Sequence, residues 1–214
     1  MERKTMIEGK REEIMNQSAP SIFGWSAYAN GILTVANMVT LGLMFGVSMS
    51  WGRVNDAISV VWLLSFLPLA LLLARLNQPV MGSAVAVTTA IVGVVAVLVF
   101  AVLQSLLVLG QVRFEQTLAA VMTLGGVMGL WLLLNGLLAL MGKTLPGGLA
   151  WLSIGFGLCY LLGTIGYWLG GYENPILWVG VAVGYLIGPV WAFWLGRLLL
   201  NGRLLPAAAL TSGG

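Results

Sequence analysis

The sequence predicts an all-α polytopic membrane bundle, and three observations support this fold class. Of the 214 residues, 59% are hydrophobic and 8% are charged, and the mean hydropathy is +0.98, whereas soluble domains carry about 25% charged residues. Between Gly31 and Leu195 the few charged side chains all fall in short breaks between apolar runs. Each run has about 18–26 residues, which is enough for a helix to cross a hydrocarbon core of roughly 30 Å.

Six transmembrane spans follow from these runs, near 27–50, 57–74, 84–109, 117–141, 149–170 and 176–199. They must be helices, because unpaired backbone groups are costly in lipid. The second span is the shortest and contains Pro68. Together the spans form a transmembrane domain over 27–199. Residues 1–26 are a polar N-terminal tail, either a short helix or a solvated leader ending near Pro20, and residues 200–214 are a C-terminal tail.

The Lys and Arg residues predict the orientation of the chain. Eight of them fall on the side of the two tails and two on the opposite side, at Arg53 and Arg113. Basic residues concentrate in cytoplasmic segments, so we expect both termini to be cytoplasmic in a multi-pass protein of the inner membrane. An interfacial belt is expected from the tryptophans near span ends, which are Trp25, Trp51, Trp151, Trp168 and Trp194. Trp62 and Trp131 fall deeper and are expected between helices.

An internal duplication is one interpretation of two similar spans. Residues 34–46 read TVANMVTLGLMFG and residues 117–129 read TLAAVMTLGGVMG, which agree at six of thirteen positions. Chance similarity in an apolar alphabet is the alternative. A true duplication would give two inverted three-helix repeats, an arrangement found in transporters with the binding site between the halves.

Catalytic and metal chemistry is not expected. The chain has no histidine, and its one cysteine, Cys159, lies within an apolar run where it is expected to pack as a small hydrophobe. No nucleophile–base pair or metal-ligand set can be assembled, so we expect no enzyme activity, metal or cofactor. The net charge of +3 is spread over the connections and predicts no nucleic-acid binding. Asp56 is the charge nearest a span, and we expect Asn55 or Asp56 to cap the second helix.

Uncharged polar residues form stripes at helical spacing. They have two interpretations: a path for a neutral solute, or hydrogen bonds between helices. The candidate residues are Asn37, Asn135, Tyr160, Thr164 and Tyr167.

Glycines repeat at intervals of four residues in several spans. Such spacing lets helix backbones approach closely, either inside the bundle or across an oligomer interface. The candidate contact residues are Gly42, Gly46, Gly125, Gly129, Gly180, Gly184 and Gly188.

The closing stretch GPVWAFWLGR, from Gly188 to Arg197, together with the six-span plan, resembles uncharacterised bacterial six-helix integral membrane proteins. This resemblance implies the general plan and carries no binding residues. Two functions therefore stay open. The first is a non-enzymatic accessory or scaffold subunit of a membrane assembly, whose partners are the lipid bilayer and a homo-oligomer or other membrane subunits. The second is a passive channel or carrier for a small neutral or apolar solute.

Overall fold

The computed structural model describes the backbone of residues 2–204 and the side chains of residues 21–204. Five long α-helices and one short 3-10 helix make up this part of the chain: α1 (Glu2–Gly46), α2 (Trp51–Val108), α3 (Phe114–Gly142), α4 (Gly147–Gly170), η1 (Gly171–Glu173) and α5 (Pro175–Leu200). All five are long and apolar enough to cross a membrane. The prediction of an all-α membrane-type bundle is confirmed.

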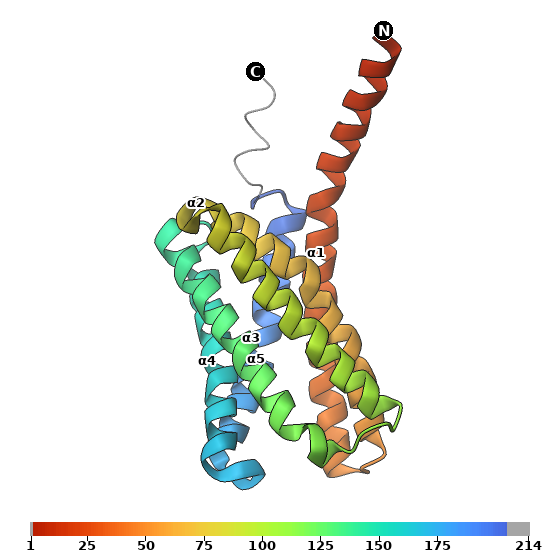
Figure 1. The fold of residues 1–214 in the computed structure, drawn as a ribbon, viewed down its shortest axis with the longest axis vertical. Coiled ribbons are helices and arrows are strands. Elements are labelled where there is room, and N and C mark those ends of the chain that lie inside the picture. Colours follow the sequence, from red (N-terminus) through yellow and green to blue (C-terminus); the bar gives the residue numbers. More distant parts are fainter. Residues whose placement is uncertain (1, 205–214) are drawn as a thin grey trace.

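Helix α2 has 58 residues and changes direction at Gly82, where two helical arms meet (Figure 1). Gly82 has φ 76° and ψ 162°, a conformation that is essentially restricted to glycine. Over its described residues the structure therefore shows five long helices and not the six expected. The predicted second and third spans lie in one element, because the backbone stays helical on both sides of Gly82 and no loop separates them. We call residues 51–81 the first arm and residues 83–108 the second arm.

The ends of the chain differ from expectation in one respect. The backbone of α1 is helical from Glu2 through Pro20 to Gly46, although the sequence predicts a boundary near Pro20. The side chains of residues 2–20 and the predicted C-terminal tail beyond residue 204 lie outside the described residues.

The helices close into a ring. Helix α1 packs against α2 and α5, α2 packs against α3, and α4 packs between α3 and α5. The start of α1 and the end of α5 lie at the same end of the bundle (Figure 1), which we call the terminal end. The connections 47–50, 109–113 and 171–174 lie at the opposite end, which we call the loop end.

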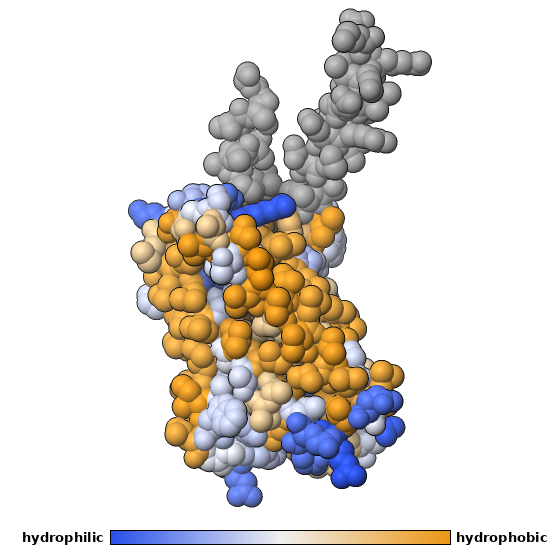
Figure 2. All heavy atoms as spheres, viewed as in Figure 1, coloured by the Kyte–Doolittle hydropathy of each residue, from blue (hydrophilic) through white to orange (hydrophobic). Residues whose placement is uncertain are grey.

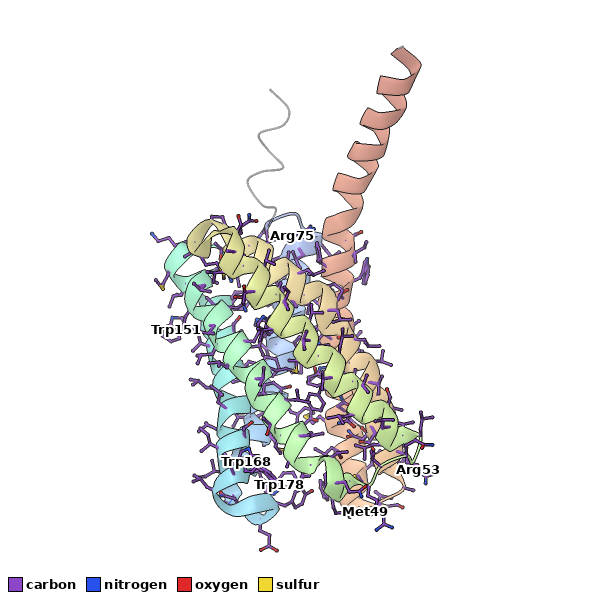
Figure 3. The ribbon with its side chains drawn as sticks, viewed as in Figure 1. Met49, Arg53, Arg75, Trp151, Trp168 and Trp178 are labelled. Atoms are coloured by element: carbon purple, nitrogen blue, oxygen red, sulfur yellow. The ribbon has the colours of Figure 1, made fainter. Side chains whose placement is uncertain are left out.

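On the face that Figure 2 shows, an apolar band lies between two more hydrophilic ends. Trp151 and Trp168 are 61% and 62% exposed, and they lie toward the terminal and loop ends of α4, respectively (Figure 3). A separation of 17 residues in a helix spans about 25 Å, close to the hydrocarbon thickness of roughly 30 Å. Trp62 and Trp131 are buried, as the sequence predicts.

Helix α4 is held by direct contact of its backbone with both neighbours. A Cβ atom added to Gly129 of α3 would lie 2.7 Å from the carbonyl oxygen of Gly157, and one added to Gly180 of α5 would lie 2.6 Å from the carbonyl oxygen of Cys159. Side chains other than hydrogen cannot fit at these distances. The three helices can pack this closely only because glycine occupies these positions.

The turn at Gly82 provides a test of the fold. We expect Gly82→Ala to destabilise the protein by about 1–3 kcal/mol, because alanine is strained at this backbone conformation although the space around it is open. The matched control is Gly42→Ala, a helical position with open space, where alanine should be neutral or slightly stabilising. Thermal unfolding followed by circular dichroism in detergent compares the two. Equal shifts in both variants would contradict this account of the turn.

Candidate functional site

A cavity of about 620 Å³ lies inside the ring of helices. Every long helix contributes to its wall. Residues near the loop end, such as Met49 and Phe114, form its mouth, whereas Thr34, Trp62 and Phe156 line its deepest part. Phe156 is 14 residues from the end of α4, so the cavity extends about 20 Å along the helices. Ligand pockets in proteins occupy about 300–1,000 Å³, and this cavity falls in that range.

The floor of the cavity is an aromatic cluster, which we define as Trp62, Phe66, Phe156 and Trp191. The ring centroids of Trp62 and Phe66 are 5.2 Å apart, those of Phe66 and Trp191 are 6.4 Å apart, and those of Phe156 and Trp191 are 6.1 Å apart. Trp62 and Phe156 face the cavity, whereas Trp191 and Phe66 are fully buried. The cluster therefore separates the cavity from the rest of the bundle.

Two hydrogen bonds fix the indole rings of the floor. Trp62 Nε1 donates to Thr34 Oγ1 at 2.8 Å, and Trp191 Nε1 donates to Ser153 Oγ at 2.7 Å. Buried indoles usually have such partners. Toward the terminal end, the interior is filled by fully buried leucines, which are Leu69, Leu73, Leu132, Leu149 and Leu195. The cavity is consequently open toward the loop end and closed toward the terminal end.

Four aromatic rings from four elements meet at the mouth. The centroid of Trp178 is 5.7 Å from that of Phe45 and 4.9 Å from that of Tyr172, and Tyr172 is 6.3 Å from Phe114. All three contacts are edge-to-face, with interplanar angles of 86–88°. Trp178 Nε1 also donates to the carbonyl oxygen of Tyr172 at 2.9 Å. We call these four residues the mouth aromatics.

Polar groups are few in the cavity wall, and two lack partners. Asp56 and Glu115 provide carboxylates and Arg53 provides a guanidinium near the mouth (Figure 3). Within the described part of the chain, Asp56 has no hydrogen bond or ion pair. Gln104 is 9% exposed, lines the cavity, and its Oε1 atom has no hydrogen-bond partner. Buried polar atoms are usually paired, so this amide oxygen is an unsatisfied acceptor beside the cavity.

The structure divides the predicted polar candidates into two groups. Tyr160 and Thr164 line the cavity, whereas Asn37, Asn135 and Tyr167 do not. Thr164 Oγ1 donates to the carbonyl oxygen of Met122 at 2.7 Å. Tyr160 lies against Phe156 with a centroid distance of 5.2 Å. The ring of Tyr167 contacts Trp168.

Asn37 and Asn135 connect helices. Asn37 Oδ1 accepts from Ser59 Oγ at 3.2 Å and its carbonyl oxygen accepts from Asn55 Nδ2 at 3.0 Å, which joins α1 to the first arm. Asn135 Oδ1 accepts from Asn77 Nδ2 at 3.1 Å, which joins α3 to the same arm, and Asn77 Oδ1 accepts from Thr144 Oγ1 at 2.7 Å. These geometries correspond to the interhelical interpretation for both asparagines.

The expectation that Asn55 or Asp56 caps the second helix is wrong. Helix α2 begins at Trp51 with Ser50 as its N-cap residue, so Asn55 and Asp56 lie inside the helix. The helix begins at residue 51 and not near residue 57, where the predicted span begins. Asn55 bonds to α1 instead of to the helix terminus, donating to Thr40 Oγ1 at 2.9 Å.

The glycine candidates also occupy different environments. Gly125 and Gly184 line the cavity, where an added Cβ would make ordinary contacts of 3.7 Å with Tyr160 and 3.5 Å with Cys159. Gly188 lies against Phe156 of the floor, with an added Cβ at 3.0 Å. Gly129 and Gly180 make the α4 contacts described above. Gly42 and Gly46 are exposed and have no atom within 4 Å of an added Cβ.

Sequence reasoning did not identify the mouth aromatics. Phe45, Phe114, Tyr172 and Trp178 are near predicted span ends, where aromatic residues are ordinarily assigned to the membrane interface. Their presence in four separate segments close to one end was the available signal. Comparisons with protein-family models, with curated proteins and with solved structures found no match.

The interhelical role of the two asparagines is testable. We expect the double variant Asn37→Leu/Asn135→Leu to unfold at a lower temperature, because each lost interhelical bond contributes about 0.6–2 kcal/mol. The exposed loop amide Gln111 provides the control variant Gln111→Leu. Thermal unfolding in detergent is the measurement. An unchanged midpoint in the double variant would contradict the assignment.

Proposed function

We propose that the protein is a non-enzymatic membrane carrier that binds a small neutral or apolar solute in the cavity. The observation that supports this most directly is the one-ended cavity, which reaches from the loop end to an aromatic floor inside the bundle. Its wall is mostly apolar, with hydroxyl and amide groups from Tyr160, Thr164 and Gln104. Such a wall suits a solute that is largely apolar and carries a few hydrogen-bonding groups.

A carrier fits better than an open channel because the cavity does not continue through the bundle. The floor and the buried leucines behind it fill the interior toward the terminal end. Passage of a solute would require the floor to rearrange. Carriers expose a site to one side at a time by moving one part of the bundle against another.

Helix α5 contains a position where it can bend, at the level of the floor. Pro189 lies inside α5, where it removes one helical hydrogen bond. Gly188 precedes it and contacts Phe156, and Trp191 follows one half-turn later. A bend of α5 at Gly188–Pro189 would displace Trp191 from the aromatic cluster. We infer that this bend opens the floor.

We further propose that the chain crosses the membrane six times. A straight helix of 58 residues would be about 87 Å long, nearly three times the hydrocarbon thickness, so each arm of α2 corresponds to one crossing. Both chain termini then lie on one side. The excess of Lys and Arg on that side supports a cytoplasmic terminal end and a mouth that faces outward, in a bacterial inner membrane.

Access to the cavity can be measured through Cys159, the single cysteine of the chain, which lines the wall. A charged, membrane-impermeant methanethiosulfonate reagent is added to sealed vesicles of either orientation. We expect Cys159 to react when the loop end faces the reagent and to react much more slowly when the terminal end does. A neutral aromatic alcohol that occupies the cavity, such as 4-phenylbutanol, should slow the reaction.

A matched pair of variants on α5 controls this measurement. Val181 lines the cavity, whereas Val179 is 58% exposed on the outer surface. Val181→Phe should fill the cavity and slow labelling of Cys159, and Val179→Phe should leave the rate unchanged. Equal labelling from both sides, or equal rates in the two variants, would rule out a one-ended binding cavity.

One observation favours the accessory or scaffold function as a second candidate. Gly42 and Gly46 lie on an exposed face of α1 with open space around them, beside the exposed apolar residues Val35 and Val39. Close helix contact is a common use of this spacing. A second copy of the chain or another membrane subunit would fit this face.

The double variant Gly42→Leu/Gly46→Leu separates the two functions. If the protein is a carrier, the variant should keep the labelling rate of Cys159 and the protection of Cys159 by a bound solute, because both positions lie outside the cavity. If the protein is a scaffold, the variant should lose its oligomer or its partner subunits. Native mass spectrometry of gently extracted protein detects this loss. Loss of assembly without any change in labelling would support the accessory function.

A further inference from the structure

Two residues of the cavity wall, Asp56 and Gln104, hold hydrogen-bond acceptors that lack partners in the described part of the chain. Gln104 Oε1 is buried and unpartnered, and the carboxylate of Asp56 has no partner within the described part of the chain. The two residues come from the two arms of α2, and both line the cavity. A molecule that satisfies them must present N–H or O–H donors.

The charged groups that line the cavity favour a cation. They are the carboxylates of Asp56 and Glu115 and the guanidinium of Arg53, so their formal sum is negative. Arg53 is exposed and makes no ion pair with either carboxylate. Asp56 is half-buried in an apolar wall, where solvent screening is weaker than at the surface and an opposite charge is attracted more strongly.

The mouth aromatics add a second kind of attraction for cations. Ring faces carry partial negative charge and attract ammonium groups within about 6 Å of the centroid. Their mutual contacts are edge-to-face, and all four side chains line the cavity. Deeper in the cavity the wall is apolar, with Leu41, Leu63, Phe100 and Val121.

We propose that the cavity binds an amphipathic organic amine in its protonated form. The ammonium group donates to Asp56 and to Gln104 Oε1 and contacts the mouth aromatics, while the apolar body extends toward the floor at Trp62 and Phe156. This inference rests on the proposed carrier function and changes the expected solute from a neutral or apolar molecule to an amphipathic cation. A protonated amine compensates the charge of the carboxylate and also interacts with the amide oxygen and the aromatic rings, whereas a neutral alcohol can donate a hydrogen bond but leaves the negative charge uncompensated.

The test compares three probes of equal shape: 4-phenylbutylamine, 4-phenylbutanol and 4-phenylbutyrate. Binding to the full-length protein in nanodiscs is measured at neutral pH by protection of Cys159 from the thiol reagent. We expect the amine to bind about tenfold or more tightly than the alcohol, given the contributions of a charged hydrogen bond and of cation–π contact. The carboxylate probe should bind most weakly.

Three variants test which residues cause the preference for the amine over the alcohol. Asp56→Asn should remove most of the advantage of the amine over the alcohol, because the amide of asparagine accepts a hydrogen bond but carries no charge. Measurable protection by the alcohol shows that the variant is folded. Gln104→Leu should weaken the binding of the amine. The matched control is Glu173→Gln, a carboxylate outside the cavity, which should change nothing.

Different results would overturn this inference and the proposed function. Equal binding of the amine and the alcohol, or an amine preference that persists in Asp56→Asn, would overturn the cationic solute and leave the cavity as a binding site. If Asp56→Asn does not fold, the comparison of the three probes on the unmodified protein decides the matter. If no probe protects Cys159, both proposals fail.

Discussion

The Trp191 indole determines where the packed core ends and the cavity begins. It is fully buried, its ring contacts Phe66 and Phe156, and its Nε1 atom is bonded to Ser153 Oγ. On its terminal side the ring of helices is filled by leucines, and on its loop side the same ring is hollow. Large side chains at this one level therefore divide a continuous bundle into a solid half and an open half.

The walls of the ring are held together in different ways. The contact between α1 and the first arm is a series of hydrogen bonds, from Asn30 and Ser65 through Trp62 and Thr34 to Asn55 and Thr40. The contacts of α4 with α3 and α5 depend on glycine and on the fit of backbone atoms. Hydrogen bonds fix register and orientation, whereas small-residue surfaces let helix backbones approach closely.

Much of the fold follows from the sequence, because spans are recognised by length and apolarity. The joining of the predicted second and third spans into one element was not predicted, since Pro79 and Gly82 mark a turn without showing that helix continues on both sides of it. The predicted duplication also remains open: Gly42 and Gly46 are exposed, whereas the matching Gly125 and Gly129 are buried against α4. Similar sequence at these four positions does not produce similar packing.

The site was harder to predict, because helical periodicity identifies a polar face and not the neighbour of that face. Asn37 and Tyr160 looked equivalent as members of polar stripes, yet Asn37 bonds to Ser59 between two helices and Tyr160 faces the cavity. Which faces line a hollow depends on how the ring closes. That closure is set by distant contacts, such as the one between α1 and α5.

The distribution of charge connects topology to the proposed ligand. Eight of the ten Lys and Arg residues were assigned to the side of the termini, and the cavity opens at the other end, where Asp56 and Glu115 face it. An organic cation that approaches the mouth therefore meets carboxylates and aromatic rings before it meets most of the basic residues. The charge asymmetry that orients a membrane protein thus leaves two of the ten basic residues, Arg53 and Arg113, at the loop end, so a positively charged solute meets less repulsion there than at the terminal end.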